Sequence, residues 1–428
     1  MKLDDVRALV VFEPAEERKN FFPISLTKPT FDFLFGTRTI VDRIEQNLGK
    51  KVTNLFVPEY LFGTTKETHP NIKVNESVNE TCLVINSLVS SRIDLSHLAK
   101  KLLANKQTTT LLDPITMNPV LAVLDGFGKE NSLLSGTVKS NHPTKKLVHS
   151  ERAIIQYPWQ MIDENSDAIS SDYANLGSNQ NRALARTSEL LGNRLLIRGE
   201  SEVGKFVTFD SRKGPIIIDE GAEIQSMSHL TGPCYVGRKS VVKSAKIREG
   251  SSVGEGCRVS GEVEETIISP YTNKNHEGFI GHSIVGSWVN LGAMTSNSDL
   301  KNTYGAINVK VGEFLVKTGS IKVGTLIGDM VKTAIGTMIY SGKKIGVGSH
   351  LFGTVTEDVP SFTLFGKSLG AESKEMYLES VLETQKRMMS RRGHSLTRNQ
   401  EDLIRAVFRL TSQERKKNSV RKGKFAFA

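Results

Sequence analysis

Apolar residues in the second half of the chain recur every six positions. The series, with one-residue slips, is Ile218, Ile224, Leu230, Val236, Val242, Ile247, Val253, Val259, Phe279, Val285, Leu291, Ile321, Ile327, Thr333, Ile339, Ile345 and Leu351. A period of six fits neither an α-helix nor an alternating strand. It predicts a solenoid of short strands, in which each six-residue unit forms one side of a triangular coil and points its aliphatic side chain inward.

Glycine follows many of these aliphatic residues, as at Val236-Gly237 and Ile327-Gly328. Small residues suit the corners of such a coil, where positive φ is often needed. Stacking of the units buries a continuous core that no single repeat could bury alone. The coil is expected from about 197 to 359, with an interrupting loop near 297–306.

The first 150 residues have a different pattern, in which short apolar runs alternate with helical stretches. Strands are predicted at 8–12, 54–57, 81–86 and 109–112, and helices at 39–44 and 96–104. This order favours a mainly parallel, helix-flanked sheet whose ligands lie at the carboxyl ends of the strands.

The chain beyond these two parts is expected to be helical. A polar connector contains one helix, and its Trp159 is expected to pack onto the first domain. After Gly370, Tyr377, Val381 and Met388 form one predicted stripe. Thr397 to Gln400 is a capping box that opens a last helix with Leu403, Ile404, Val407 and Phe408 on one face. The predicted domains are 1–140 (α/β), 141–196 (connector), 197–370 (coil) and 371–428 (helical basic tail).

Composition narrows the setting of the protein. Cys82, Cys234 and Cys257 stand singly, which argues against a disulfide framework and a CxxC metal site and favours a reducing cytoplasm. No apolar run is long enough to span a bilayer, so no membrane contact is expected. Residues 385–428 hold 13 Lys and Arg against 3 Asp and Glu, which accounts for the whole net charge of +10. We interpret this tail as solvated, and nucleic-acid binding is not expected.

One polar stretch interrupts the aliphatic repeat, at residues 272–279. It contains His276 between Lys274, Asn275 and Phe279, and Asn290 follows fourteen residues after the histidine. A histidine in such a setting is a candidate general base. His276 and His282 also raise the alternative of a zinc site, but a third ligand and the matching spacing are missing, so no metal site is predicted.

These features together resemble a known family. The α/β head, the hexapeptide coil and the segments 273–281 and 327–336 look like the bifunctional sugar-1-phosphate nucleotidyltransferase/glucosamine-1-phosphate N-acetyltransferases, closest to their archaeal and Bacteroidetes-type relatives. The resemblance covers nearly the whole chain except the tail. It implies a left-handed parallel β-helix, a homotrimer and acetyl-CoA as the acyl donor.

The resemblance also implies roles for single residues in the coil. His276 would be the catalytic base, and Phe279 and Asn290 would contact the sugar. Asn275, Lys274 and Lys301 would complete the substrate site, the two lysines on the ground of charge. The acetyl-CoA contacts would be Gly292, Ala293, Asn297 and Gly336.

The head departs from the family pattern at two places. Where the family has a Gly-rich loop for the nucleotide phosphates, this chain has the residues 12–19, and a later Gly36-Thr37-Arg38 stands at the start of a helix instead. Asn86 stands where the family has an Asp for Mg²⁺, and a neutral amide is the poorer ligand. Arg18 and Lys28 are candidates for the nucleotide phosphates, with solvated basic side chains as the alternative.

We therefore expect an acetyl-CoA-dependent transferase that acetylates an amino-sugar 1-phosphate, glucosamine 1-phosphate first, in the synthesis of a UDP-N-acetylglucosamine-type sugar nucleotide. The head is expected to be a weak or degenerate nucleotidyltransferase, which would need Mg²⁺ if active. The alternative is a regulatory or scaffold protein that binds a sugar nucleotide without acetyl transfer.

Overall fold

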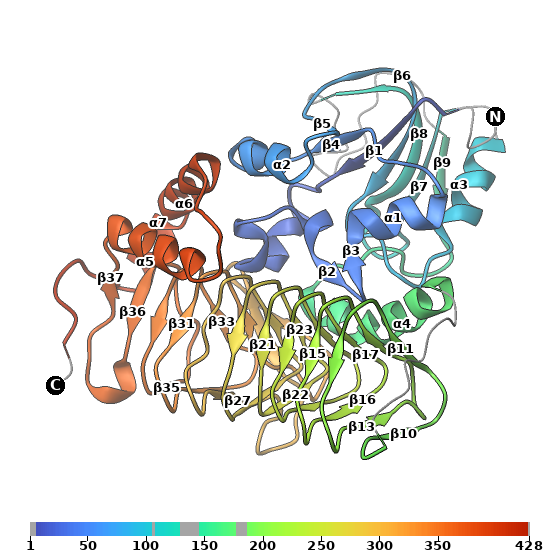
Figure 1. Ribbon diagram of the computed structural model, residues 1–428. Coiled ribbons are helices and arrows are strands. Elements are labelled where there is room, and N and C mark those ends of the chain that lie inside the picture. The colour runs from blue at the N-terminus through green and yellow to red at the C-terminus, as the bar shows by residue number, and fades with distance from the viewer. Residues whose placement is uncertain (1–5, 105–107, 129–144, 177–185, 427–428) are drawn as a thin grey trace. The chain divides into compact units, whose positions relative to one another are not determined.

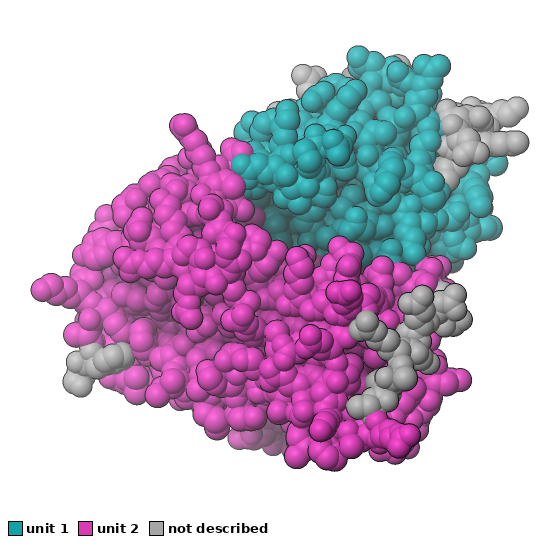
Figure 2. Space-filling view, in the orientation of Figure 1, with its two compact units in different colours: residues 1–21, 28–33, 38–160 teal, residues 22–27, 34–37, 161–428 magenta. Residues whose placement is uncertain are grey.

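The chain forms two compact units in the computed structural model, which describes residues 6–104, 108–128, 145–176 and 186–426 (Figure 2). Unit 1 comprises residues 1–21, 28–33 and 38–160, and unit 2 comprises residues 22–27, 34–37 and 161–428. Part of the predicted connector, at 177–185, lies outside the described residues. None of the helices in the described part has the length and apolar character needed to cross a bilayer.

Unit 1 is built on one sheet with the strand order β5-β4-β1-β6-β8-β7-β9. The four predicted strands are confirmed as β1 (Ala8–Phe12), β4 (Asn54–Phe56), β6 (Val78–Asn86) and β7 (Thr109–Leu112). The sequence reasoning missed β5 (Lys73–Val74), β8 (Pro119–Phe127) and β9 (Lys145–Val148). Strand β8 is antiparallel to both β6 and β7, while the other pairs are parallel, so the sheet is mixed.

The two predicted helices of unit 1 are confirmed, and a third helix between them was missed. Helix α1 (Ile40–Leu48) begins after Thr39, whose hydroxyl accepts a hydrogen bond from the Asp42 amide, and it ends at Gly49 in the left-handed region. Helix α3 (Leu95–Ala104) packs beside α1 and against β7 and β8, while α2 (Phe62–Thr68) packs near β5. Trp159 is buried and stacks on Tyr157 with a ring separation of 4.5 Å.

Unit 2 is a left-handed parallel β-helix with three faces (Figure 1). The first face is β11 (Leu195–Ile197), β14 (Ile216–Ile218), β17 (Cys234–Val236), β20 (Ser251–Val253), β23 (Ile267–Ile268), β26 (Ile284–Val285), β30 (Leu326–Ile327) and β33 (Lys344–Ile345). The second face is β10 (Glu189–Leu191), β13 (Thr208–Asp210), β16 (His229–Thr231), β19 (Lys246–Ile247), β22 (Glu262–Glu264), β25 (Phe279–Gly281), β27 (Ser296–Asn297), β32 (Met338–Ile339) and β35 (Thr354–Val355). The third face is β12 (Glu202–Val203), β15 (Glu223–Ile224), β18 (Val241–Val242), β21 (Arg258–Val259), β24 (Asn273–Lys274), β31 (Lys332–Thr333), β34 (His350–Leu351) and β36 (Thr363–Phe365), with β37 (Lys374–Glu375) added antiparallel.

The six-residue period predicted the inward side chains with two exceptions. The aliphatic members from Ile218 to Val259 are all buried in one continuous core. Phe279 is only half-buried, and its neighbour Ile280 takes the inward position. Ile321 is 51% exposed, because it lies in an excursion outside the coil. The strands also extend beyond the predicted limits of 197 and 359, since β10 begins at Glu189 and β36 ends at Phe365.

The glycines after the inward aliphatics have a different reason from the one predicted. The backbone does not take positive φ at Gly237, Gly254, Gly328 or Gly346. Instead, a Cβ on Gly237 would lie 2.7 Å from the carbonyl carbon of Gly254, one rung away. Close contact between stacked backbones therefore excludes a side chain there.

The loop predicted at 297–306 belongs to a longer excursion. Ile284 pairs directly with Leu326 on the next rung of the first face. The chain between these two rungs is therefore longer than one turn of the coil, and its extra residues form the excursion. The excursion contains an antiparallel hairpin of β28 (Asn308–Val311) and β29 (Phe314–Lys317). The sequence reasoning missed this hairpin.

Helices cover parts of the coil within unit 2. Ile169 of α4 (Pro158–Leu176) packs on the outer side of the first face, against Leu196, Ile217 and Tyr235. The Asn165 and Asp172 side chains of α4 accept hydrogen bonds from the amides of Gly36 and Thr37. These two amides are therefore engaged by protein groups.

The tail forms α5 (Leu378–Ser390), α6 (Arg398–Leu410) and α7 (Ser412–Lys417). The predicted capping box at Thr397 and Gln400 is confirmed. The predicted stripe on the first tail helix is wrong at two positions, because Tyr377 is exposed and Met388 half-buried, while Leu382 and Met389 are buried beside Val381. The tail is not simply solvated. Arg415 is 1% exposed, forms an ion pair with Glu375 at 2.7 Å and lies over the Phe408 ring.

Candidate functional site

The third face of the coil carries a column of polar side chains. Neighbouring residues on a strand point to opposite sides, so one residue of each rung faces inward and the preceding one faces outward. The outward residues on successive rungs are Arg258, Asn273, Asn290 and Lys332. These four side chains form one wall of a cavity of about 750 Å³.

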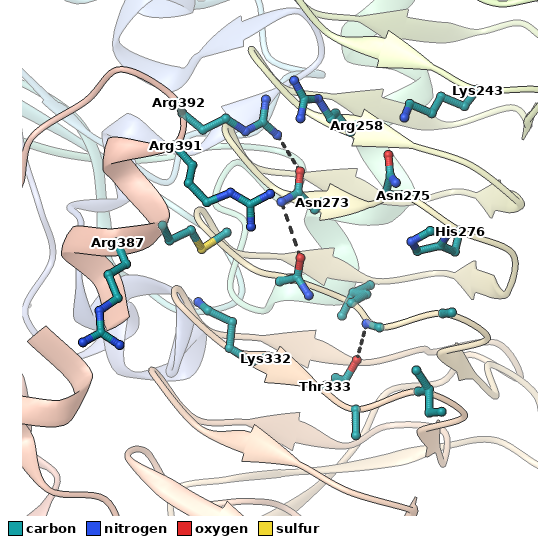
Figure 3. Close-up of a pocket in the computed structure, with 17 residues that line it drawn as sticks. Lys243, Arg258, Asn273, Asn275, His276, Lys332, Thr333, Arg387, Arg391 and Arg392 are labelled. Atoms are coloured by element: carbon teal, nitrogen blue, oxygen red, sulfur yellow. Dashed lines mark hydrogen bonds between the residues drawn. The ribbon is translucent and has the colours of Figure 1, made fainter. Parts of the chain in front are cut away.

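The opposite wall comes from the end of α5 and the turn that follows it. Arg387, Met388, Arg391 and Arg392 line the cavity from this side (Figure 3). The guanidinium of Arg392 donates a hydrogen bond to Oδ1 of Asn273. This wall is therefore joined to the coil by a direct contact.

An aromatic cluster holds the turn after α5 on the coil. Tyr271 and Trp288 stack with their ring centroids 4.6 Å apart, and His394 meets both rings edge-on. All three residues belong to unit 2. The tail thus closes one side of the cavity in the same chain that supplies the coil.

His276 and Asn275 lie at one end of the cavity (Figure 3). His276 stands on an exposed turn between β24 and β25, which leaves its imidazole accessible. Oδ1 of Asn275 is buried and has no hydrogen-bond partner within the described residues. An unsatisfied buried acceptor is costly, so this oxygen is suited to receive a hydrogen bond from a ligand.

The floor between these groups is backbone and small side chains. Gly292, Ala293 and Ala334 line it, together with Thr333. The Gly292 amide donates to Oγ1 of Thr333 at 2.8 Å, which links the floor to the next rung. A ligand can thus approach the main chain closely here.

The cavity has a one-sided charge. Its lining contains six cationic side chains and no Asp or Glu, namely Lys243, Arg258, Lys332, Arg387, Arg391 and Arg392. Burial lowers the pKa of Lys332 to about 7, and its Nζ donates to the carbonyl oxygens of Trp288 and Met330 at 3.1 and 2.9 Å. Burial and the nearby charges of Arg258 and Arg391 also lower the pKa of Arg392. An anion bound here would favour the charged forms of both side chains, so the lining is suited to an anionic ligand.

The next residue of the outward column does not add charge. His350 pairs with Lys332 in the strand register. Burial and the charge of Lys332 lower its pKa to about 4. His350 is therefore neutral near pH 7.

Lys274, which was predicted to bind the substrate, does not line the cavity. Lys274 occupies the inward position of β24, is 2% exposed and is not among the lining residues. Its Nζ donates to backbone carbonyl oxygens within the coil. It cannot meet a substrate phosphate from there.

Four further predicted residues lie away from the cavity. Asn297 is buried inside the coil, and both ends of its amide bond to the backbone of Gly281. Phe279 is half-buried on the second face. Nζ of Lys301 donates to the Ala306 carbonyl in the excursion. Gly336 is exposed at a corner and does not line the cavity, whose lining ends at Ile335. Local sequence could not show these directions, because they depend on which face each strand joins.

The residues predicted to bind a nucleotide in unit 1 mostly have protein partners. Arg18 is buried, forms an ion pair with Glu13 at 3.1 Å and donates to the Tyr60 hydroxyl at 2.8 Å. Asn86 is fully buried, and its amide bonds to the backbone at Pro119 and Leu88. Lys28 is half-buried at the start of the segment 28–33.

At these strand ends the Asn86 amide is bonded to the backbone and the Glu13 carboxylate is paired with Arg18. Among the described residues, no cluster of three His, Cys, Asp or Glu side chains is placed to hold a metal ion. His282 instead contacts Asp299 at 2.7 Å and Glu265 at 3.3 Å, which raise its pKa to about 9 despite burial.

Several lining residues were missed by the sequence reasoning. Arg258, Asn273 and Lys332 each precede an inward residue, and that alternation was a usable signal. Lys243 has the corresponding place just after the inward Val242. The tail arginines gave no such signal, because their position depends on a long-range contact between α5 and the coil.

Comparison with known proteins agrees with this two-part architecture. A family model described as sugar nucleotidyl transferase matches residues 9–181. The bifunctional sugar-1-phosphate nucleotidylyltransferase/acetyltransferase of Sulfurisphaera tokodaii is 30% identical over 206 residues, which cover 46% of this chain and 43% of that protein. The bifunctional protein GlmU of Methanococcus aeolicus is 32% identical over 155 residues, which cover 36% of this chain and 37% of that protein. The matched regions thus span less than half the length of these relatives.

Among solved structures, an Arabidopsis UDP-N-acetylglucosamine acyltransferase aligns with 13% identity and a TM-score of 0.27, over 56% of this chain and 99% of that chain. In sequence, residues 9–181 are similar to the sugar nucleotidyl transferase family, and the chain is similar to the bifunctional sugar-1-phosphate nucleotidylyltransferase/acetyltransferases.

Proposed function

We propose that the cavity on the third face is the active site of an acetyl-CoA-dependent N-acetyltransferase that acts on an amino-sugar 1-phosphate, glucosamine 1-phosphate first. The observation that carries this proposal is the joint placement of an accessible His276 and a set of six cations without a carboxylate in one cavity. Both substrates carry phosphate groups, which such a lining would bind. The names of the relatives support acetyl transfer and sugar 1-phosphates as the chemistry.

His276 would act as the general base. The amine nitrogen attacks the thioester carbon, the C–N bond forms, and the C–S bond breaks as the thiolate of coenzyme A leaves. The imidazole accepts the proton that the amine loses and returns it to the thiolate. Imidazole is suited to this exchange because it gains and loses protons near neutral pH.

The remaining lining residues would orient the substrates. Asn275 offers its unsatisfied Oδ1 to a hydroxyl or amine of the sugar, and Asn290 adds a second amide on the same wall. The floor at Gly292 and Ala293 would lie along the thioester, where only small groups leave room. The cations would hold the phosphates of both substrates and so keep the amine nitrogen close to the thioester carbon.

We infer that unit 1 is a degenerate nucleotidyltransferase. Phosphoryl chemistry needs positioned charge for the phosphates and for Mg²⁺. Glu13 and Asn86 stand at the ends of β1 and β6, Arg18 lies in the short helix that follows β1, and protein groups engage all three. Family membership of residues 9–181 does not by itself restore the activity.

We also infer that the chain assembles as a homotrimer. Large apolar side chains are exposed along the corner between the third and second faces, and such exposure is typical of an interface. They are Phe206 (58%), Met227 (71%), Met294 (54%) and Ile335 (80%). Light scattering should give a mass of three copies, and a single-copy mass at micromolar concentration would contradict this inference.

Replacing His276 by Ala tests the proposed function. The variant should acetylate glucosamine 1-phosphate about 10²–10⁴-fold more slowly, which is the usual contribution of a positioned base. The matched control is His229→Ala, because His229 is an exposed histidine on β16 of the second face, outside the cavity. The proposal fails if His276→Ala keeps the wild-type rate, or if the intact protein acetylates none of a panel of amino-sugar 1-phosphates.

A further inference from the structure

The inward column of the third face contains one charged side chain. The other inward residues near it are Val242, Val259, Leu291, Thr333 and Leu351. At the centre of this series Lys274 is 2% exposed. A lysine costs free energy in such a place, since its charged form loses its water, and burial accordingly lowers its pKa to about 8.

Backbone carbonyl oxygens inside the coil bind the ammonium of Lys274. Its Nζ donates to the carbonyl oxygen of Ser260 at 2.6 Å and to that of His276 at 3.2 Å. Gly261 makes the room, because a Cβ there would lie 2.7 Å from Nζ and 2.6 Å from the carbonyl oxygen of Gly278. An aliphatic side chain at this position would fill the core and would need neither the two carbonyl acceptors nor the space left by Gly261. The fold alone therefore does not require a lysine here.

The contact with His276 matters because of the turn on which that residue stands. The later part of the turn is anchored to neighbouring rungs, as the Glu277 and Gly278 carbonyl oxygens accept bonds from the amides of Met294 (2.9 Å) and Glu262 (3.1 Å). His276 and Glu277 themselves are exposed. Among the described residues, the donor to the His276 carbonyl oxygen is Nζ of Lys274.

We propose that Lys274 is the positioning residue for His276: from inside the coil it ties the His276 carbonyl to Ser260 of the previous rung and so holds the imidazole at the cavity. This inference rests on the proposed role of His276 as the base. Lys274 does not touch the substrate, because its amine points into the coil. It acts through the main chain of the residue two positions later.

The test is Lys274→Met in the full chain, which keeps the side-chain length and removes the donor. Leu351→Met is the matched control, as an inward residue of the same face outside the cavity. We expect Lys274→Met to lower kcat for acetylation about 10–100-fold, with KM for acetyl-CoA changed less than about twofold. The melting temperature should stay within about 4 °C of wild type.

A second readout does not depend on activity. In protein labelled with ¹³C at histidine Cε1, the His276 signal is assigned by its loss in His276→Asn. Lys274→Met should shift or broaden that signal, and Leu351→Met should leave it in place. This readout separates the two proposals, because it reports the position of the ring even if His276 is not the base.

The inference is wrong if Lys274→Met keeps both the wild-type kcat and the wild-type His276 signal. If Lys274→Met does not fold, Lys274→Leu, which resembles its aliphatic neighbours, decides by the same two readouts. If neither variant folds, Lys274 is a structural residue and the inference is overturned.

Discussion

Two regions of this protein place basic side chains where phosphate could bind, and they differ in what those side chains face. In the short helix that follows β1 in unit 1, Arg18 is buried against Glu13 and the Tyr60 hydroxyl. In unit 2, six basic side chains line one cavity, and none of them forms an ion pair within the described residues.

This difference distinguishes a basic side chain that stabilises the fold from basic side chains that are available to bind a ligand. A buried cation that has its own carboxylate is already neutralised, and a phosphate would have to break that pair. Basic side chains that share a cavity without a carboxylate gain when an anion binds, because the ligand reduces their mutual repulsion. The sequence resemblance predicts nucleotide binding in unit 1, whereas the six basic side chains of the cavity favour an anion site in unit 2.

The largest effect is expected from removing one partner of the pair in unit 1. Glu13→Ala would leave Arg18 buried without its carboxylate and should lower the free energy of unfolding of unit 1 by about 3–5 kcal/mol. Urea unfolding can be followed through Trp159, which lies in unit 1, in a Trp288→Phe background that silences the other tryptophan.

The control for this change is Glu16→Ala. Glu16 forms an exposed ion pair with Lys19 at 2.7 Å, and such pairs contribute little. Equal stability of the Glu13 and Glu16 variants would show that the buried pair is not a structural element, and would return Arg18 to the candidates for phosphate binding.

A smaller effect is expected from pH in unit 2. The pKa of Lys332 is about 7 because of burial, so the amine is charged below that pH and becomes neutral above it. A phosphate ligand favours the charged form, and its affinity should therefore be greatest below pH 7. Between pH 6.5 and 8 calorimetry should show acetyl-CoA binding weaken about 3–10-fold.

Lys332→Met isolates this effect from other titrations. The variant should bind acetyl-CoA more weakly at pH 6.5 and should lose the part of the pH dependence that Lys332 causes. The sign for stability is opposite. The unfolded chain binds the Lys332 proton up to about pH 10.4, so the free energy of unfolding should rise with pH from about 7 to 10. The same pH dependence of binding in both proteins would exclude Lys332 from the site.

Much of the fold could be predicted from the sequence because the six-residue repeat and the short apolar runs are both local patterns. The six-residue step identified the inward aliphatics such as Val236 and Ile345, and the apolar runs identified β1 and β6. The hairpin of the excursion was missed because it lies outside the repeat. Phe279 was assigned to the core one position early, since the coil shifts its phase by a residue at that rung.

The site could be predicted only in part. His276, Asn275, Asn290, Gly292 and Ala293 do lie on one cavity, and the sequence resemblance had named them. Lys274 was misjudged because a lysine in a polar stretch looks solvated, whereas its strand position turns it inward. The tail arginines were read as solvated charge. Their role depends on the packing of α5 against the coil, which no local pattern reports.

The central claim is that this chain binds its phosphate-bearing ligand in the cavity of unit 2 and not at the strand ends of unit 1. The most direct measurement is calorimetric titration of the full chain with acetyl-CoA and, separately, with UTP and Mg²⁺, repeated on Arg392→Met. We expect acetyl-CoA to bind the wild-type protein and to bind Arg392→Met about tenfold more weakly, as the loss of one charge-assisted contact predicts. UTP with Mg²⁺ should give no saturable heat. Saturable UTP binding that Arg18→Met abolishes, with acetyl-CoA binding absent or unaffected by Arg392→Met, would contradict the account.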